Sequence, residues 1–182
     1  MKNQEITIRL ADFSQAEDAE ALIGIMESYA AGENGDGKGL SSYTRENLAR
    51  SLHDLPHAFT LLAFVHRQPA GLANCFMQFS TFSCRPILNL HDLAVLPEFQ
   101  GRGIGGALLD QVTCQAEIRG CCKVTLEVLS KNFKAQRLYQ RHDFTPYQLS
   151  EETGHALFWE KPLTPAAQPE SRTDTIDSLT RG

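Results

Sequence analysis

The sequence predicts a mixed α/β fold in a single domain. Some segments alternate apolar and polar residues, as half-buried strands do, and others carry apolar residues at helical spacing. The order of these segments combines a hairpin with strand–helix–strand crossovers. We therefore expect a sheet that is antiparallel at its hairpins and parallel where helices cross over. The length of 182 residues suits one domain that buries its own core.

The first half of the chain predicts two helices before the main hairpin. Residues 5–10 alternate as a strand, and residues 16–30 carry one apolar stripe, with Asp12 or Ser14 as the expected helix cap. Four glycines in the nine residues 31–39 predict a loop. Residues 44–54 predict a second helix with Thr44 as its N-cap. Residues 58–66 and 70–80 then predict two strands joined by a turn at Gln68-Pro69.

The second half predicts three more strands and two helices. We expect strands over residues 87–95, 122–129 and 155–160, and helices over residues 103–118 and 133–141, the first of them ended by Gly120. From about Leu163 the composition shifts to Thr, Pro, Ser, Asp and Arg. We expect one domain over residues 1–162 and a disordered tail over residues 163–182.

Composition excludes several classes of function. The net charge of −5 and the pI near 5.7 argue against a broad nucleic-acid-binding surface. The five cysteines show no zinc-site spacing, and counting from Asn34 the glycine-rich loop places Arg45 where a calcium loop needs Glu, so we expect no metal. No apolar run approaches the ~20 residues that cross a membrane, and no signal segment starts the chain. We therefore expect a soluble cytoplasmic protein that binds no nucleic acid and no membrane.

A glycine-rich turn before the helix at 103–118 is the most informative motif. Gly101, Gly103, Gly105 and Gly106 precede or open an amphipathic helix, whose first N–H groups have no intrahelical partners and attract phosphate. Arg102 adds a positive charge. A tight turn alone requires one or two glycines. The spacing also fits the dinucleotide-binding G-x-G-x-x-G, but five residues separate the strand from the first glycine, where that fold has none. No Walker A sequence is present.

The residues around this turn resemble the GCN5-related N-acetyltransferases, the GNAT family. Gln100-Gly101-Arg102-Gly103-Ile104-Gly105 fits the family's Q/R-x-x-G-x-G/A signature, and Asn132, Ala135, Leu138 and Tyr139 fit its N-x-x-A-x-x-L/F-Y helix. Within the family, Phe79 to Val95 and the segment from Tyr139 are similar to the polyamine and thialysine acetyltransferase branch. The resemblance implies a mostly antiparallel sheet with a splayed parallel strand pair, acetyl-CoA as acetyl donor, and a homodimer. Asp143 stands where the family has Gly, and Asp tolerates the left-handed backbone conformation.

The resemblance also implies a set of residues that bind the donor. The backbone N–H groups of residues 101–106 would hold the pyrophosphate, and the strand backbone at Leu93, Ala94 and Val95 would pair with the pantetheine arm. Asn132 and Ala135 would face the same groove from a helix. The full set is Leu93, Ala94, Val95, Gln100, Gly101, Arg102, Gly103, Ile104, Gly105, Gly106, Asn132 and Ala135.

Two residues are candidates for proton transfer. The resemblance makes Tyr139 the general acid for the departing thiolate, since a phenol can donate to a thiolate of similar basicity. His91 stands where the related enzymes carry Glu, and histidine titrates near neutrality, so it is the candidate base; a structural strand histidine is the alternative. Alternation places His91 and Asp92 on opposite faces of their strand, with Asp92 expected to cap a helix or to bond backbone groups.

The acceptor is less well defined by the sequence. Glu27, Glu33 and Asp36 lie in or beside the first helix and loop, which border the acceptor site in this family, and would suit a cationic amine. The leading hypothesis is acetyl transfer to a primary amine of a small molecule, polyamine-like or amino-acid-like, by direct attack in a ternary complex. The alternatives are a protein N-terminus or lysine as acceptor, and a non-catalytic acetyl-CoA-binding sensor.

Overall fold

The computed structural model describes residues 5–32, 35, 37–148, 152 and 156–163. The chain divides into two compact units, Met1–Pro146 and Tyr147–Gly182, and each is described separately. The first unit carries the complete sheet and four α-helices. Among the described residues, no helix combines the length and hydrophobicity that a membrane crossing requires, and no group of three His, Cys, Asp or Glu side chains is placed to hold a metal.

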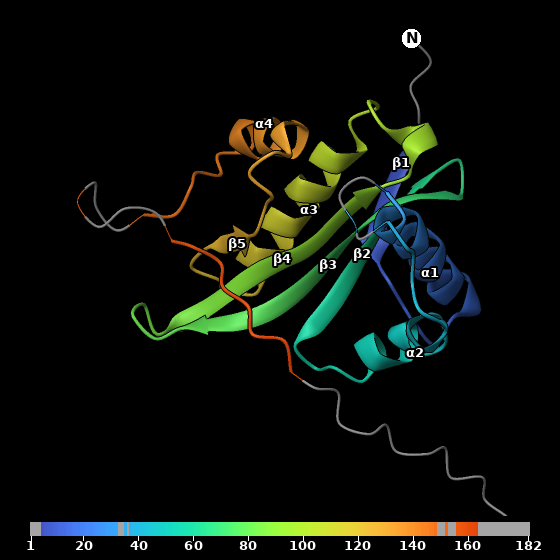
Figure 1. Ribbon diagram of the computed structural model, residues 1–182, viewed down its shortest axis with the longest axis horizontal. Coiled ribbons are helices and arrows are strands. Elements are labelled where there is room, and N and C mark those ends of the chain that lie inside the picture. The colour runs from blue at the N-terminus through green and yellow to red at the C-terminus, as the bar shows by residue number, and fades with distance from the viewer. Residues whose placement is uncertain (1–4, 33–34, 36, 149–151, 153–155, 164–182) are drawn as a thin grey trace, which may run out of the picture. The chain divides into compact units, whose positions relative to one another are not determined.

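A five-stranded sheet in the order β1-β2-β3-β4-β5 forms the centre of the first unit (Figure 1). The strands are β1 (Ile6–Leu10), β2 (Ala58–Val65), β3 (Gln68–Ser80), β4 (Arg85–Val95) and β5 (Val124–Leu126). The pairs from β1 to β4 are antiparallel, whereas β4 and β5 are parallel. This mixed sheet confirms the predicted fold class. Short turns join β2 to β3 and β3 to β4, the segment with α1 and α2 joins β1 to β2, and a crossover through α3 joins the parallel strands β4 and β5.

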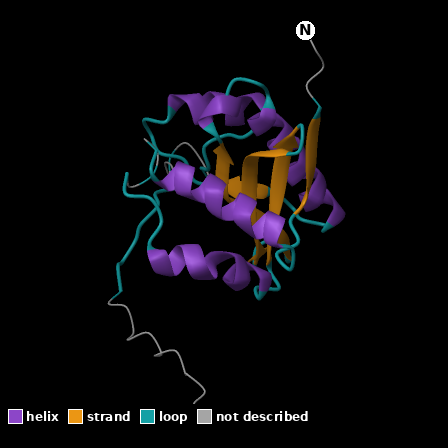
Figure 2. Ribbon diagram, turned by 90° about the vertical axis from the view of Figure 1, so that its right-hand side faces the viewer, coloured by secondary structure: helices purple, strands orange, loops and turns teal. Residues whose placement is uncertain are grey.

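Helices cover both faces of the sheet. Helices α1 (Ala16–Ala30) and α2 (Ser42–His53) lie on one side, and α3 (Ile104–Ile118) and α4 (Phe133–Arg141) on the other, as Figures 1 and 2 show. Two cores result. One joins Leu22 and Ile25 of α1 to Leu62 and Leu72, and the larger joins α3 to the opposite face of β2, β3 and β4. The sheet therefore holds α1 and α4 on opposite sides of β4.

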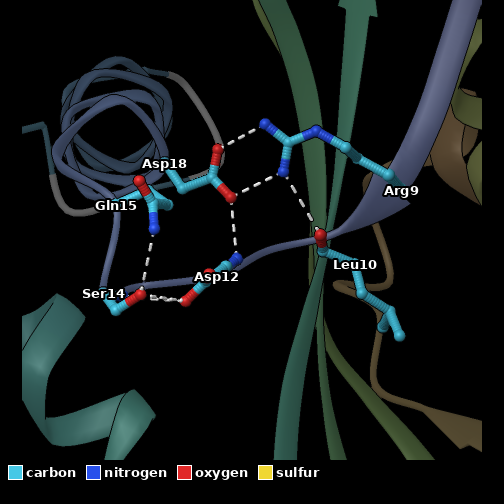
Figure 3. A network of polar contacts seen from close by, with 6 residues as sticks. All are labelled: Arg9, Leu10, Asp12, Ser14, Gln15 and Asp18. Atoms are coloured by element: carbon cyan, nitrogen blue, oxygen red, sulfur yellow. Dashed lines mark hydrogen bonds and ion pairs between the residues drawn. The ribbon is translucent and has the colours of Figure 1, made fainter.

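A buried carboxylate fixes the start of α1. Asp18, only 1% exposed, forms an ion pair with Arg9 of β1 and also accepts a hydrogen bond of 2.7 Å from the Asp12 backbone N–H (Figure 3). The hydrogen bond from Arg9 holds the pKa of Asp18 below its usual value. The expected cap by Asp12 or Ser14 was wrong. Gln15 is the N-cap and makes no side-chain cap bond. The Asp12 carboxylate instead accepts hydrogen bonds from the backbone N–H and the hydroxyl of Ser14.

The second helix begins two residues earlier than predicted. Its N-cap is Ser41, whose hydroxyl accepts a 3.1 Å hydrogen bond from the Thr44 backbone N–H. Thr44 therefore occupies the third helical position rather than the cap. Several hydroxyl residues stand together in this segment, so that local sequence alone does not select which of them accepts the bond.

The second unit differs most from the sequence expectation. The described residues 156–160 of the predicted strand 155–160 form no strand, although the Ala156 N–H donates to the Tyr147 carbonyl at 3.1 Å.

In the first unit, the strand predicted over 122–129 is reduced to Val124–Leu126. Alternation identifies an extended segment, but a strand also needs a neighbouring backbone to pair with. Residue 155 and the predicted disordered tail from residue 164 lie outside the described residues.

Candidate active site

The glycine-rich turn leads from β4 into α3 with left-handed backbone at two positions. Gly101 has φ +75° and Gly103, the N-cap of α3, has φ +83°. Only glycine adopts these values without strain. Because Gly103 has no side chain, the N–H groups of Ile104, Gly105 and Gly106 meet no side-chain cap. The turn therefore presents the positive end of a helix that can receive an anion.

The other two glycines have a different role. A Cβ on Gly105 would come within 3.1 Å of Leu138 Cδ2, and a Cβ on Gly106 within 3.1 Å of His142 Nε2. Their small size lets α4 pack closely on the first turn of α3. All four glycines were predicted to serve anion binding. The structure adds a second role for two of them, the close contact between α3 and α4, which positions Tyr139 of α4.

Parallel pairing between β4 and β5 stops where the predicted donor-binding segment begins. The register runs from Leu88–Val124 to Leu90–Leu126, and among the described residues no further pair follows. Strand β4 continues for five residues beyond Leu90, to Val95. Leu93, Ala94 and Val95 therefore lie where the two strands have separated, as the resemblance implies for a splayed pair.

Side chains from the turn and from α4 tie this region together. Gln100 donates to the Val95 carbonyl at 3.2 Å and accepts a hydrogen bond from Lys134 of α4. Asn132 caps α4, accepting from the Ala135 backbone N–H at 3.1 Å. Arg102 is exposed and lies 5.3 Å from the centroid of the Phe99 ring. These contacts place two cations, Arg102 and Lys134, beside the segment that opens α3.

Tyr139 is placed to keep its proton. Its ring packs against the larger core and lies 6.0 Å from the ring of Phe144. Burial, with a smaller effect of Tyr29, raises the pKa of Tyr139 to about 12. A phenol with this pKa is protonated at neutral pH, which a general acid requires. Tyr29 of α1 was not predicted, because nothing in the local sequence pattern shows that α1 and α4 bring their phenols, Tyr29 and Tyr139, near each other.

A β-bulge changes the orientation expected for His91 and Asp92. The register of β4 on β3 shifts between Asn74–Asp92 and Cys75–Leu90, which leaves His91 without a partner. The Asp92 carboxylate accepts from Asn74 Nδ2 at 2.9 Å, and the His91 ring meets Phe76 edge-on at 5.4 Å. Since Asn74 and Phe76 share a face of β3, His91 and Asp92 also share a face. The prediction of opposite faces was therefore wrong, and the partner that the structure gives Asp92 is the side chain of Asn74.

Glu27 holds the loop between α1 and α2 in place. Its carboxylate accepts from Arg45 at 2.9 and 3.1 Å and from the Leu40 backbone N–H at 3.1 Å. Arg45 in particular lowers the pKa of Glu27. Gly39 passes so close, with φ +75°, that a Cβ there would lie 2.4 Å from Glu27 Oε1. This arrangement gives Glu27 a structural role, and its contact with an amine stays a prediction. Glu33 and Asp36 lie outside the described residues.

A cavity of about 580 Å³ lies between α1 and the loop that Glu27 holds. Its lining residues are Met26, Tyr29, Ala30, Gly35, Lys38, Gly39, Leu40, Ser41 and Thr44. Tyr29 thus belongs both to this cavity and to the surroundings of Tyr139. The cavity has the size of a small-molecule site.

Residues 19–144, which contain all of these features, match the family model described as Acetyltransferase (GNAT) family. The chain belongs to the GNAT family. This match confirms the resemblance based on the turn and on α4. The mixed sheet with a parallel β4–β5 pair confirms the fold that the family implies.

Individual relatives match parts of the GNAT chain. Over 70 residues it is 40% identical to the thialysine N-epsilon-acetyltransferase of Sus scrofa, covering 38% of this chain and 41% of that protein. Over 84 residues it is 32% identical to an uncharacterized N-acetyltransferase of Archaeoglobus fulgidus, covering 46% of this chain and 57% of that protein. These matches span about half the length of the curated relatives.

The fold is also shared with an aminoglycoside N-acetyltransferase crystallised in complex with CoA. The TM-score is 0.67 at 19% identity, over 89% of this chain and 98% of that one. At this identity, the similarity shows a common fold.

Proposed function

We propose that this protein transfers the acetyl group of acetyl-CoA to a primary amine of a small molecule, polyamine-like or amino-acid-like, by direct attack in a ternary complex. The observation that supports the proposal is the separation of β4 from β5 beyond Leu90, at the end of β4 that leads into the turn and the α3 N-terminus without a side-chain cap. In the proposal this helix end receives the phosphates of the donor, and Tyr139, which keeps its proton at neutral pH, is the general acid.

The residues present fit acetyl-CoA as the donor. The backbone N–H groups from Gly101 to Gly106 suit a pyrophosphate, with Arg102 adding charge, and Lys134 is a further cation held nearby by Gln100. The backbone of Leu93, Ala94 and Val95 is free of β5 and suits an extended arm that pairs like a strand. Asn132 and Ala135, at the first turn of α4, border the same region.

The protein's own residues then carry the protons of the transfer. An alkyl amine is charged at neutral pH, so His91 removes one proton to free the nitrogen lone pair. The nitrogen bonds to the acetyl carbonyl carbon as the carbon–sulfur bond breaks, and the nitrogen then releases its second proton to solvent, which leaves a neutral amide. Tyr139 gives its proton to the departing thiolate and is reprotonated from solvent. The products are the N-acetylated amine and the free thiol of CoA.

The test compares two tyrosine variants in a thiol-release assay with polyamines, lysine analogues, amino acids and aminoglycosides as acceptors. We expect Tyr139→Phe to lower kcat by about 10² to 10⁴, the usual contribution of a positioned acid, with CoA binding retained. Tyr43→Phe is the matched control, because Tyr43 is exposed on α2. Equal activity of the Tyr139→Phe and wild-type proteins would contradict the role of Tyr139. CoA binding without turnover of any amine would instead favour a protein acceptor or a sensor.

Homodimerisation is a further part of the proposal, and it rests on the family resemblance. Sedimentation equilibrium at micromolar concentration tests it: a dimer mass supports the proposal and a monomer mass contradicts it.

A further inference from the structure

A chain of polar side chains crosses the buried centre of the sheet. Thr60 of β2 donates to Asn74 Oδ1 at 2.6 Å, and Asn74 Nδ2 of β3 donates to Asp92 Oδ2 of β4 at 2.9 Å. Thr60 is paired with Asn74, and Asn74 with Asp92, across neighbouring strands. Thr60 and Asn74 are only 2% and 3% exposed. Burying such groups is unfavourable unless each is hydrogen-bonded, and an apolar layer would serve stability as well.

The order of the bonds fixes the orientation of Asp92. The Thr60 hydroxyl donates to the amide oxygen of Asn74, so that the amide nitrogen must point toward Asp92. The same nitrogen lies 3.6 Å from the Met26 sulfur of α1. Asn74 thus holds the Asp92 carboxylate by a neutral amide. The contact orients the carboxylate, and among the described residues no cationic side chain forms an ion pair with it.

The Asp92 carboxylate lies on the face of the sheet that α1 covers, and the cavity lies on this side of the sheet. Met26 and Tyr29 of α1 line the cavity, and Met26 contacts Asn74. Burial, with a smaller effect of Asp92, raises the pKa of the Tyr29 phenol. The bulge at His91 puts the candidate base on this same face. Among the described residues of the cavity region, further charged groups are Lys38, in its lining, and the Glu27–Arg45 pair behind its loop.

We propose that Asp92 binds the ammonium group of the acceptor and that Thr60 and Asn74 are positioning residues that hold it for this purpose. The inference rests on the proposed function and names its acceptor class: an amine that arrives positively charged. Asp92 anchors the charged nitrogen beside His91, which then removes the proton that the attack requires. The bulge is essential, because regular alternation would turn one of the two side chains to the opposite face.

The first test changes the charge of Asp92 without changing its shape. Asp92→Asn is assayed with the best amine of the panel and with a fluorinated analogue whose weakly basic amino group is mostly uncharged at neutral pH. We expect KM for the charged amine to rise about ten- to a hundredfold, as for loss of a hydrogen bond to a charged group. KM for the uncharged analogue and for acetyl-CoA should stay unchanged. Asp54→Asn, at the exposed end of α2, is the control.

The second test changes the positioning residue. Thr60→Val removes the hydroxyl at nearly constant volume, whereas Thr60→Ser keeps it. We expect Thr60→Val to raise KM for the charged amine about three- to tenfold, in line with a lost neutral hydrogen bond, and Thr60→Ser to stay near wild type. An equal rise of KM for both amines in Asp92→Asn, or equal behaviour of Thr60→Val and Thr60→Ser, would overturn the inference.

The inference and the proposed function can fail separately. If the wild-type protein turns over no amine, the proposed function fails. Calorimetric titration of the amine panel into wild-type and Asp92→Asn proteins saturated with CoA then still decides the inference. Weaker binding of charged amines by Asp92→Asn supports it, and equal binding, or no binding by either protein, refutes it.

Discussion

Substitution of Gly106 by Ala tests whether the contact between α3 and α4 positions Tyr139. The new Cβ would lie 3.1 Å from His142 Nε2, about 0.4 to 0.9 Å closer than a relaxed contact. The 3.1 Å contact with Asp110 restrains the His142 ring, so we expect part of the shift to fall on α4, which carries Tyr139. A displacement near 1 Å can cost about a hundredfold in rate, and we expect kcat to fall about tenfold for half of that.

The effect on stability has two opposing parts. Replacing Gly by Ala within a helix favours folding by up to about 1 kcal/mol, whereas overpacking costs about 1–3 kcal/mol. We therefore expect Gly106→Ala to destabilise the protein by roughly 0–3 kcal/mol. Gly24→Ala is the matched control, because a Cβ at Gly24 of α1 meets nothing within 4 Å. That variant should gain up to about 1 kcal/mol and keep its activity.

The assay is thiol release at saturating acetyl-CoA, with stability measured by urea denaturation. His142→Ala removes the overlapping ring, so the double variant Gly106→Ala/His142→Ala should recover most of the kcat that Gly106→Ala loses, relative to His142→Ala alone. A Gly106→Ala protein as stable and as active as Gly24→Ala would refute the reasoning, and so would additive effects in the double variant.

Three other predictions concern stability and reactivity. Asp18→Asn should lose about 2 kcal/mol at neutral pH, a value reduced from that of a fully buried pair because Arg9 is 43% exposed. The pKa of Asp18 is lower in the folded state than in the unfolded state, where it lies near 4. The stabilisation is therefore present above the unfolded-state pKa and disappears as the pH falls through the folded-state pKa. The free energies of unfolding of the two proteins, measured by urea denaturation, should converge in acid, and a difference that stays constant with pH would contradict this. Gly39→Ala strains a backbone at φ +75° and displaces the Glu27 carboxylate, so we expect the free energy of unfolding to fall by about 1–3 kcal/mol and KM for the amine to rise. An unchanged thermal midpoint would contradict the expected loss of stability. Burial raises the pKa of Cys75 to about 12, so brief iodoacetamide treatment of the native protein should modify the exposed Cys84 and Cys114 but not Cys75, as peptide mass spectrometry would show; early modification of Cys75 would refute its burial.

The sequence predicted the elements whose signals are local. Helix α4 matches its predicted bounds, 133–141, because Asn132 is a strong cap and the family motif covers the helix. Asp143 adopts φ +64°, in agreement with the expectation that it replaces a left-handed glycine. The glycine-rich turn was also found, since left-handed backbone and an uncapped helix start depend on residues within the turn itself.

Features that depend on tertiary contacts could not be predicted in the same way. The bulge at His91 is defined by the shifted register between β3 and β4, and in the sequence of β4 it corresponds only to two consecutive polar residues, His91 and Asp92, between Leu90 and Leu93. The roles of Gly105 and Gly106 depend on α4, which lies about thirty residues further along the chain. Thr60 and Asn74 read as ordinary strand residues until the register brings them beside Asp92. The place of Tyr29 in the lining of the cavity likewise depends on how the chain folds and not on its local sequence.

The central claim is that acetyl leaves CoA and arrives on an amine nitrogen. The most direct measurement incubates the wild-type protein with acetyl-CoA and each amine, and quantifies both the released thiol and the acetylated amine by mass spectrometry. We predict one N-acetylated product per thiol released, with charged alkyl amines as the preferred acceptors. Thiol release without an acetylated amine, or CoA binding without either product, would contradict the account.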